Sequence, residues 1–140
     1  MSSGAPALTA GDRRRSVVIE DLTRTQLVQY AGASGDYNPL HSDDVFAREV
    51  GGYPGVFAHG MLTMGLTGRV LTDWVGDDSL LEFGVRFVAQ VWPGDTLTVE
   101  AVVRELGERD GRPVAEIDIV TLNQDGTQVM AGTAVARLDR

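Results

Sequence analysis

The chain has 140 residues, no cysteine and a formal net charge of −8, and all of its basic residues are arginine. This length suits one domain that buries a core without disulfides or thiolate-bound metal. The acidity argues against nucleic acid and anionic membranes as partners, and the lack of lysine excludes Schiff-base chemistry and lysine-containing phosphate-binding loops.

Residues 1–15 are rich in Ser, Ala, Gly and Arg and hold no apolar run long enough for a signal peptide or a membrane span. We expect them to form a flexible lead-in to a cytoplasmic protein whose domain occupies residues 16–140. The domain is predicted to begin with a strand, because residues 16–20 (SVVIE) form a β-branched run.

A helix is predicted directly after this strand. Thr23 and Gln26 have the spacing of a capping box, in which each side chain bonds the backbone N–H of the other residue. Leu22 and Leu27 have the spacing of a hydrophobic staple across the same helix start. We expect Gly32 to end the helix, since glycine is the usual residue there.

The loop over residues 35–41 (GDYNPLH) holds the first candidate site. Pro39 would cost a helix interior about 3 kcal/mol, and it pushes Asn38 toward extended backbone angles. The stretch must therefore double back, which lets Asp36 and His41 point at one place. A carboxylate and an imidazole that share one water form an acid-base pair.

The same residue types also occur in turns that have no chemical role. Asp36 and Asn38 could simply bond nearby backbone, and His41 could be a structural histidine. The residues of the loop leave both interpretations open.

A short helix is expected after the loop. Ser42 can cap it, and Asp43 and Asp44 in its first turn carry the charge preferred at a helix N-terminus. The glycines at 51–52 would end it. Because the helix start accounts for both carboxylates and no further ligands stand out, we expect no metal site and no other cofactor.

The longest helix is predicted over residues 60–74. Its first amides have no partner inside the helix, and a glycine there lets a ligand approach the backbone. Gly60 is therefore a candidate oxyanion site, while His59 could assist it or merely cap or pack the helix. Apolar side chains cover most of the circumference, so we expect a sheet to wrap around this helix. They are Met61, Leu62, Met64, Leu66, Val70, Leu71 and Trp74.

The last part of the chain is predicted to form strands. Polar and apolar residues alternate with the period of a half-buried strand, and turn sequences rich in glycine separate the runs. These runs are residues 81–91, 97–103, 115–119 and 127–138. We expect an α+β domain in which an antiparallel meander of about five strands curls around the long helix.

An acid-base pair beside an oxyanion site suits proton removal next to a carbonyl, or addition of water to a double bond conjugated with it. The motifs also resemble a known family. The segments 30–41 (YAGASGDYNPLH) and 58–62 (AHGML) resemble those of the MaoC-like, R-specific enoyl-thioester hydratases and the single-hotdog hydroxyacyl dehydratases. The likeness covers about residues 16–138, and the segments 58–65 and 74–77 are similar to mycobacterial (3R)-hydroxyacyl carrier-protein dehydratases.

This resemblance implies a single hotdog fold and a reversible reaction between a trans-2-enoyl thioester and its (3R)-3-hydroxyacyl form, carried on CoA or an acyl carrier protein. Asp36 and His41 would activate the water, and the Gly60 N–H would stabilise the thioester oxygen. Asn38 would support the loop, and Tyr30 would line the pocket.

The resemblance also implies a dimer, because a single hotdog leaves its acyl tunnel incomplete. The second subunit could be a copy of this chain or a different hotdog protein. Two other functions stay open at this point. One is a hotdog acyl thioesterase, and the other is a non-catalytic subunit that completes the tunnel of a partner.

Overall fold

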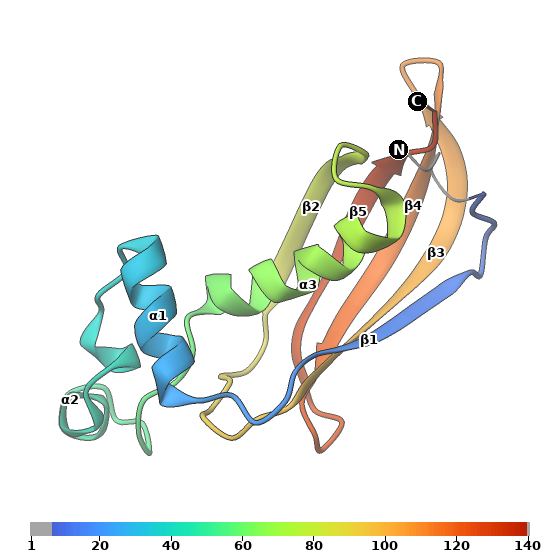
Figure 1. Ribbon diagram of the computed structural model, residues 1–140. Coiled ribbons are helices and arrows are strands. Elements are labelled where there is room, and N and C mark those ends of the chain that lie inside the picture. The colour runs from blue at the N-terminus through green and yellow to red at the C-terminus, as the bar shows by residue number, and fades with distance from the viewer. Residues whose placement is uncertain (1–6, 140) are drawn as a thin grey trace.

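The computed structural model describes residues 7–139, which form a curved sheet with a helix across its concave face and a smaller helical layer at one end (Figure 1). Residues 1–6 of the expected lead-in lie outside the described residues. The first strand, β1 (Arg13–Ile19), begins earlier than predicted, because its arginines pair with the strand beside it. Leu8, also within the expected lead-in, packs into the core.

The sheet has five antiparallel strands in the order β1-β3-β4-β5-β2. The remaining strands are β2 (Leu80–Phe87), β3 (Leu97–Arg109), β4 (Arg112–Leu122) and β5 (Gln128–Arg137). The predicted meander is confirmed for β3, β4 and β5. It is wrong for β2, which lies at the far edge beside β5.

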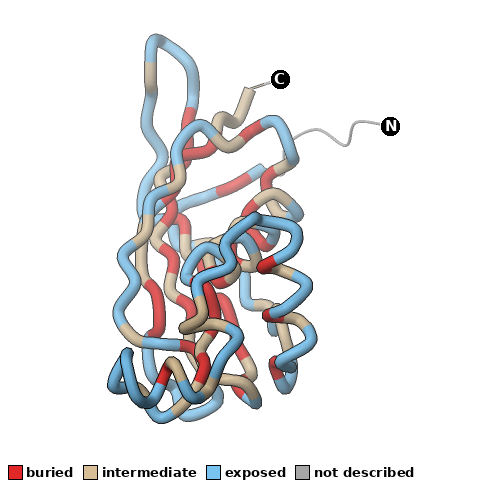
Figure 2. Tube along the Cα trace, turned by 90° about the vertical axis from the view of Figure 1, so that its left-hand side faces the viewer, coloured by how far each residue is buried: buried red, intermediate tan, exposed pale blue. Residues whose placement is uncertain are grey.

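The segment between β2 and β3 explains this difference. Instead of turning back in a hairpin, it bonds to the segments that lead into two helices: Ala58 N–H donates to the Val91 carbonyl, and Gly94 N–H donates to the Leu22 carbonyl. The strand predicted over 81–91 therefore ends at Phe87. Figure 2 shows buried residues recurring along the strands, while the tip of the β3–β4 hairpin is exposed.

The long helix α3 (Gly60–Val75) matches its prediction closely in extent. The sheet covers only one side of it, so the expectation of burial all around is wrong, and Met61 is 57% exposed. Two polar residues, Thr63 and Thr67, lie on the buried side. The Thr67 hydroxyl lies 2.7 Å from that of Thr121 on β4, which satisfies both groups in the core.

The helical layer consists of α1 (Arg24–Ser34), the 3₁₀ turn η1 (Pro39–His41) and α2 (Asp44–Glu49). The capping box of Thr23 and Gln26 is confirmed. Helix α1 continues past Gly32, and Gly35 ends it with a left-handed φ of 76°. A glycine inside a helix is tolerated, whereas the reversal at residue 35 requires one.

Helix α2 is capped by Asp43 and not by Ser42 as expected. The Asp43 carboxylate accepts hydrogen bonds from the N–H groups of Val45 and Phe46, which a charged oxygen does well at a helix start. Within residues 7–139, no helix has the length and apolar character needed to cross a membrane.

Candidate active site

The loop between α1 and η1 places Asp36 and Asn38. The N–H of Asn38 donates to the Asp36 carboxylate at 3.2 Å, and the Asn38 side chain accepts from the Leu40 N–H at 3.0 Å. Asn38 thus caps η1, whose first residue is Pro39. These bonds agree with the role expected for Asn38, which is to support the loop. The Asp36 carboxylate is exposed.

His41 is held by a main-chain carbonyl. Its Nδ1 lies 2.6 Å from the carbonyl oxygen of Phe57. Because a carbonyl can only accept, Nδ1 must carry the proton, which leaves a lone pair on Nε2 of the neutral ring. The Phe57 ring also meets the imidazole edge-on, with centroids 5.1 Å apart. His41 therefore presents Nε2 as a group that can accept and return a proton.

His59 is 2% exposed and supports both members of the pair. Its ring stacks on that of His41, with centroids 3.9 Å apart and an interplanar angle of 26°. Its Nε2 lies 3.0 Å from the main-chain carbonyl oxygen of Asp36, so this nitrogen must donate. His59 caps α3 with its backbone only, because its side chain makes no capping bond.

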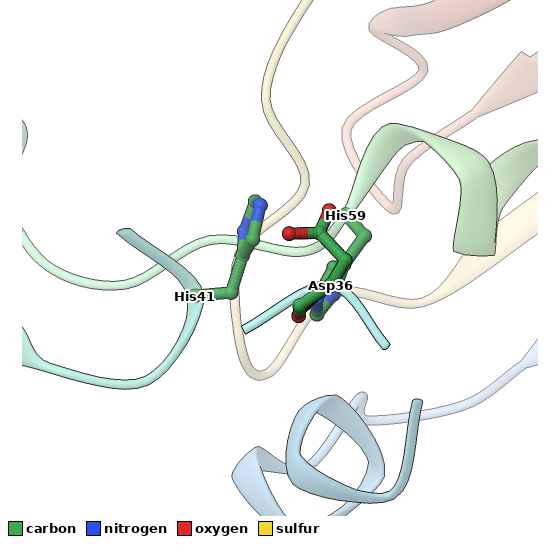
Figure 3. Close-up of side chains that lie close together, drawn as sticks. All are labelled: Asp36, His41 and His59. Carbon is green, nitrogen blue, oxygen red and sulfur yellow. Dashed lines mark hydrogen bonds between the residues drawn. The ribbon is translucent and has the colours of Figure 1, made fainter. Parts of the chain in front are cut away.

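Three elements thus bring Asp36, His41 and His59 together (Figure 3). One potential ligand atom from each lies within 4.8 Å of the others. The sequence indicated the convergence of Asp36 and His41. It gave no sign that His59 would bond the acid-base loop, because that contact spans 23 residues of chain.

The same three residues do not suit a metal ion. A histidine binds metal through the lone pair in its ring plane, about 2.0–2.1 Å from zinc. The two stacked rings hold their planes nearly parallel, so their lone pairs do not converge on one point. In addition, His41 Nδ1 and His59 Nε2 are each bonded to a carbonyl. We therefore assign no metal to this cluster.

The N-terminus of α3 opens onto a cavity of about 270 Å³. Gly60 is the first residue of the helix, and its N–H has no hydrogen-bond partner within residues 7–139. A Cβ at this position would lie 3.1 Å from the Phe87 ring, so glycine keeps the approach open. The lining comprises Phe57, Ala58, Gly60, Thr63, Phe87, Val88, Ala89, Gln90, Val91 and Val129.

The acid-base pair lies beside this cavity and not in its wall. Phe57 joins them, since it lines the cavity and its carbonyl binds His41. Tyr30, expected to line the pocket, instead meets His59 edge-on from α1 at 4.8 Å. Thr63, which was not predicted as a site residue, lines the cavity because it lies one helical turn after Gly60 on the same face.

The model of the MaoC like domain matches residues 7–124. The chain belongs to the MaoC-like domain family. The hotdog fold expected from the sequence is confirmed by solved members of similar shape. The R-hydratase PhaJ1 of Pseudomonas aeruginosa is 27% identical with a TM-score of 0.80, and the match covers 95% of this chain and 83% of that one. The (R)-hydratase of A. caviae is also 27% identical with a TM-score of 0.81, over 96% of this chain and 99% of that one.

Curated relatives of this MaoC-like domain are longer proteins. The 3-hydroxyacyl-thioester dehydratase Y of Mycobacterium tuberculosis is 37% identical over 62% of this chain and 31% of its own length. The enoyl-CoA hydratase ChsH3 of the same organism is 35% identical over 70% of this chain and 32% of its own length. The chain thus spans about a third of the length of each of these relatives.

An ion pair and a hydrogen bond of Asp44 connect the segments that carry the site residues. The Asp44 carboxylate accepts from the Val56 N–H at 3.0 Å and lies 2.8 Å from the Arg24 guanidinium. The Val56 hydrogen bond first, and then Arg24, lower the pKa of Asp44 below its ordinary value of 3.8. Asp44 thereby joins α1 and α2 to the chain just before Phe57, whose carbonyl orients His41.

The lowered pKa of Asp44 predicts that this residue contributes to stability in a pH-dependent way. A carboxyl whose pKa is lowered on folding stabilises the folded state above its unfolded pKa, and the effect disappears as pH falls through the folded value. Asp44→Asn should therefore lower the urea midpoint of unfolding at pH 7, and the gap to wild type should close as the pH drops below about 4. The control is Asp73→Asn, which removes a carboxylate that makes no hydrogen bond or ion pair within residues 7–139. A gap for Asp44→Asn that stays constant with pH would contradict this role.

Proposed function

We propose that this MaoC-like domain catalyses the reversible addition of water to a trans-2-enoyl thioester, giving the (3R)-3-hydroxyacyl thioester of CoA or an acyl carrier protein. The observation that carries the proposal is the convergence of the Asp36 carboxylate and the His41 imidazole beside the unbonded amide of Gly60. The names of the hydratases and dehydratases among the relatives support it.

The chemistry follows from the positions of these groups. A water held between Asp36 and His41 loses a proton to one of them, and its oxygen bonds to C3 of the enoyl group. The electrons of the double bond move toward the thioester oxygen, where the Gly60 N–H stabilises the negative charge. The proton taken from the water is then delivered to C2, so the pair ends as it began, and the reverse sequence removes water.

The Gly60 amide has a specific task in this scheme. Charge develops on the thioester oxygen only during the reaction, so a fixed N–H aimed at it stabilises the transition state more than the substrate. Loss of one such donor typically costs about 2.7–4 kcal/mol of transition-state stabilisation.

We assign His59 and Asn38 as positioning residues. His59 donates to the main chain of Asp36 and stacks on His41, so it fixes the distance between acid and base. Asn38 caps η1 and so fixes the end of the loop on which His41 stands. We also propose that the domain works as a dimer with a second hotdog subunit. The cytoplasmic location expected from the sequence stays a prediction.

The acid-base pair is tested by two variants. Asp36→Asn and His41→Ala should each lower the rate of hydration of a short trans-2-enoyl-CoA by about 10²–10⁴-fold, since general acid-base groups contribute that much. Loss of the conjugated enoyl absorbance measures the rate. A coloured thiol reagent serves as control, because a hydratase frees no CoA and an acyl thioesterase does. Wild-type turnover in both variants would rule the mechanism out.

The role of His59 is tested by separating its two contacts. His59→Phe keeps a stacked ring but loses the donor to Asp36, and His59→Gln keeps a donor but loses the ring. Each should lower kcat by up to about 10²-fold with little change in KM, because misplaced groups impair the chemical step more than binding.

The same His59 substitution made in the Asp36→Asn variant distinguishes this positioning role from a general folding defect. If His59 acts through Asp36, then His59→Phe should have no further effect in that background. An equal loss of rate in both backgrounds would show that His59 acts independently of Asp36.

A further inference from the structure

Thr63 is a buried residue at the candidate site whose hydroxyl has no role so far. It is 3% exposed, lies on α3 one turn after Gly60, and lines the cavity. We infer that the Thr63 hydroxyl is a second catalytic donor, which hydrogen-bonds the thioester oxygen together with the Gly60 N–H. This assignment rests on the proposed function and adds a side chain to its oxyanion site.

The hydroxyl of Thr63 is not satisfied within the fold. Thr67, one turn further along the same helix, is also buried, and its oxygen lies 2.7 Å from that of Thr121. A threonine in a helix can instead bond a carbonyl of the preceding turn, as Thr72 does. Thr63 makes neither kind of bond within residues 7–139. A buried hydroxyl without a partner lowers stability, so an apolar residue would suit the fold better at this position.

The Thr63 oxygen borders open space. Within residues 7–139, the fully buried side-chain atoms that lack a partner belong to His59, Arg137 and Asp139. The Thr63 oxygen also lacks a partner but is not one of these atoms, so it is not fully enclosed by protein. Because Thr63 is otherwise buried and lines the cavity, we place its hydroxyl at the cavity wall.

Helix geometry sets this hydroxyl beside the amide of Gly60. Helical side chains lean toward the N-terminus and cover the turn before their own Cα. The residue at that turn is a glycine, which has no side chain to separate the hydroxyl from a ligand. Residues three apart on a helix are neighbours at about 5–6 Å. An oxyanion accepts at about 2.7–3.1 Å from each donor, so one oxygen can lie between these two donors.

A threonine hydroxyl suits the stabilisation of a developing charge. It donates one hydrogen bond and keeps its proton throughout, so the proton transfers stay with Asp36 and His41. Its bond to the thioester oxygen strengthens as negative charge forms there, which favours the transition state over the substrate. The side chain is β-branched and buried, so few rotamers are open to it and little freedom is lost when substrate binds.

Gln90 is the other residue of the cavity lining with a polar side chain. It lies in the irregular segment after β2 and is exposed. A long, exposed side chain loses more rotamer freedom when it is fixed on a ligand than a buried threonine does. The second donor is therefore assigned to Thr63 and not to Gln90.

Steady-state kinetics of the full chain test the donor. Thr63→Val removes the hydroxyl and keeps the shape of the side chain. It should lower kcat for hydration of a short trans-2-enoyl-CoA by about 10²–10³-fold with little change in KM, because the lost bond strengthens only as charge develops. Thr63→Ser keeps a hydroxyl and should retain most of the wild-type rate. A loss of this size in Gln90→Leu but not in Thr63→Val would overturn the assignment.

Thr67→Val is the matched control for a structural effect. It removes a buried hydroxyl from the same helix and leaves that of Thr121 without its partner, so it should lower the urea midpoint of unfolding but not kcat. Thr63→Val should lower kcat and leave the midpoint unchanged or raised, since it breaks no bond of the fold. A lower midpoint for Thr63→Val with an unchanged kcat would show a structural hydroxyl and contradict the donor role.

The hydrogen bond can also be observed without turnover. Butyryl-CoA has no double bond to hydrate, and a ¹³C label at its thioester carbonyl isolates the stretching band of that group in infrared difference spectra. Hydrogen bonds to the oxygen lower the stretching frequency. Bound butyryl-CoA should therefore absorb at lower frequency than the free ligand with wild type and Thr63→Ser, and the shift should be smaller with Thr63→Val.

These measurements separate the donor role from the proposed function. A wild-type protein that binds butyryl-CoA but hydrates no enoyl thioester would contradict the proposed function, and the carbonyl shift would then decide the donor role alone. Equal values of kcat and equal shifts for wild type and Thr63→Val would overturn the donor role and leave the proposed function standing. A protein that neither binds butyryl-CoA nor hydrates an enoyl thioester would overturn both.

Discussion

The candidate site depends on one hydrogen bond, from His59 Nε2 to the main-chain carbonyl of Asp36. His59 directly precedes Gly60 in the chain, so this bond fastens the N-terminus of α3 to the acid-base loop. The His59 ring also stacks on the ring of His41. A single buried side chain therefore contacts the acid-base loop and the imidazole and directly precedes the oxyanion amide.

This arrangement has a cost. The other nitrogen of His59, Nδ1, is buried without a partner within residues 7–139. A buried polar atom left unbonded typically costs about 1–3 kcal/mol. Edge-on contact with Tyr30 and stacking on His41 offset part of it. Because the unbonded Nδ1 lowers stability, the presence of His59 is better explained by the positions it gives to Asp36 and His41 than by a gain in stability.

Local signals predicted much of this site, and contacts distant in sequence supplied the rest. Pro39 is excluded from a helix interior and so rules out one continuous helix from Asp36 to His41, which made the convergence of these two residues predictable from a few residues. The choice between Gly32 and Gly35 as the helix end was not, because both are glycines and only the turn of the following loop decides. The bond from His59 and the place of β2 beside β5 join segments far apart in sequence, which no local pattern encodes.

The most direct test of this account is the protonation of the ring nitrogens, observed by long-range ¹H–¹⁵N NMR at a pH where both rings are neutral. The chain has only two histidines, so His59→Phe assigns the signals without ambiguity. The two hydrogen bonds to carbonyl oxygens predict opposite tautomers, with the proton on Nδ1 of His41 and on Nε2 of His59. A shared tautomer, or a proton on Nε2 of His41, would contradict it.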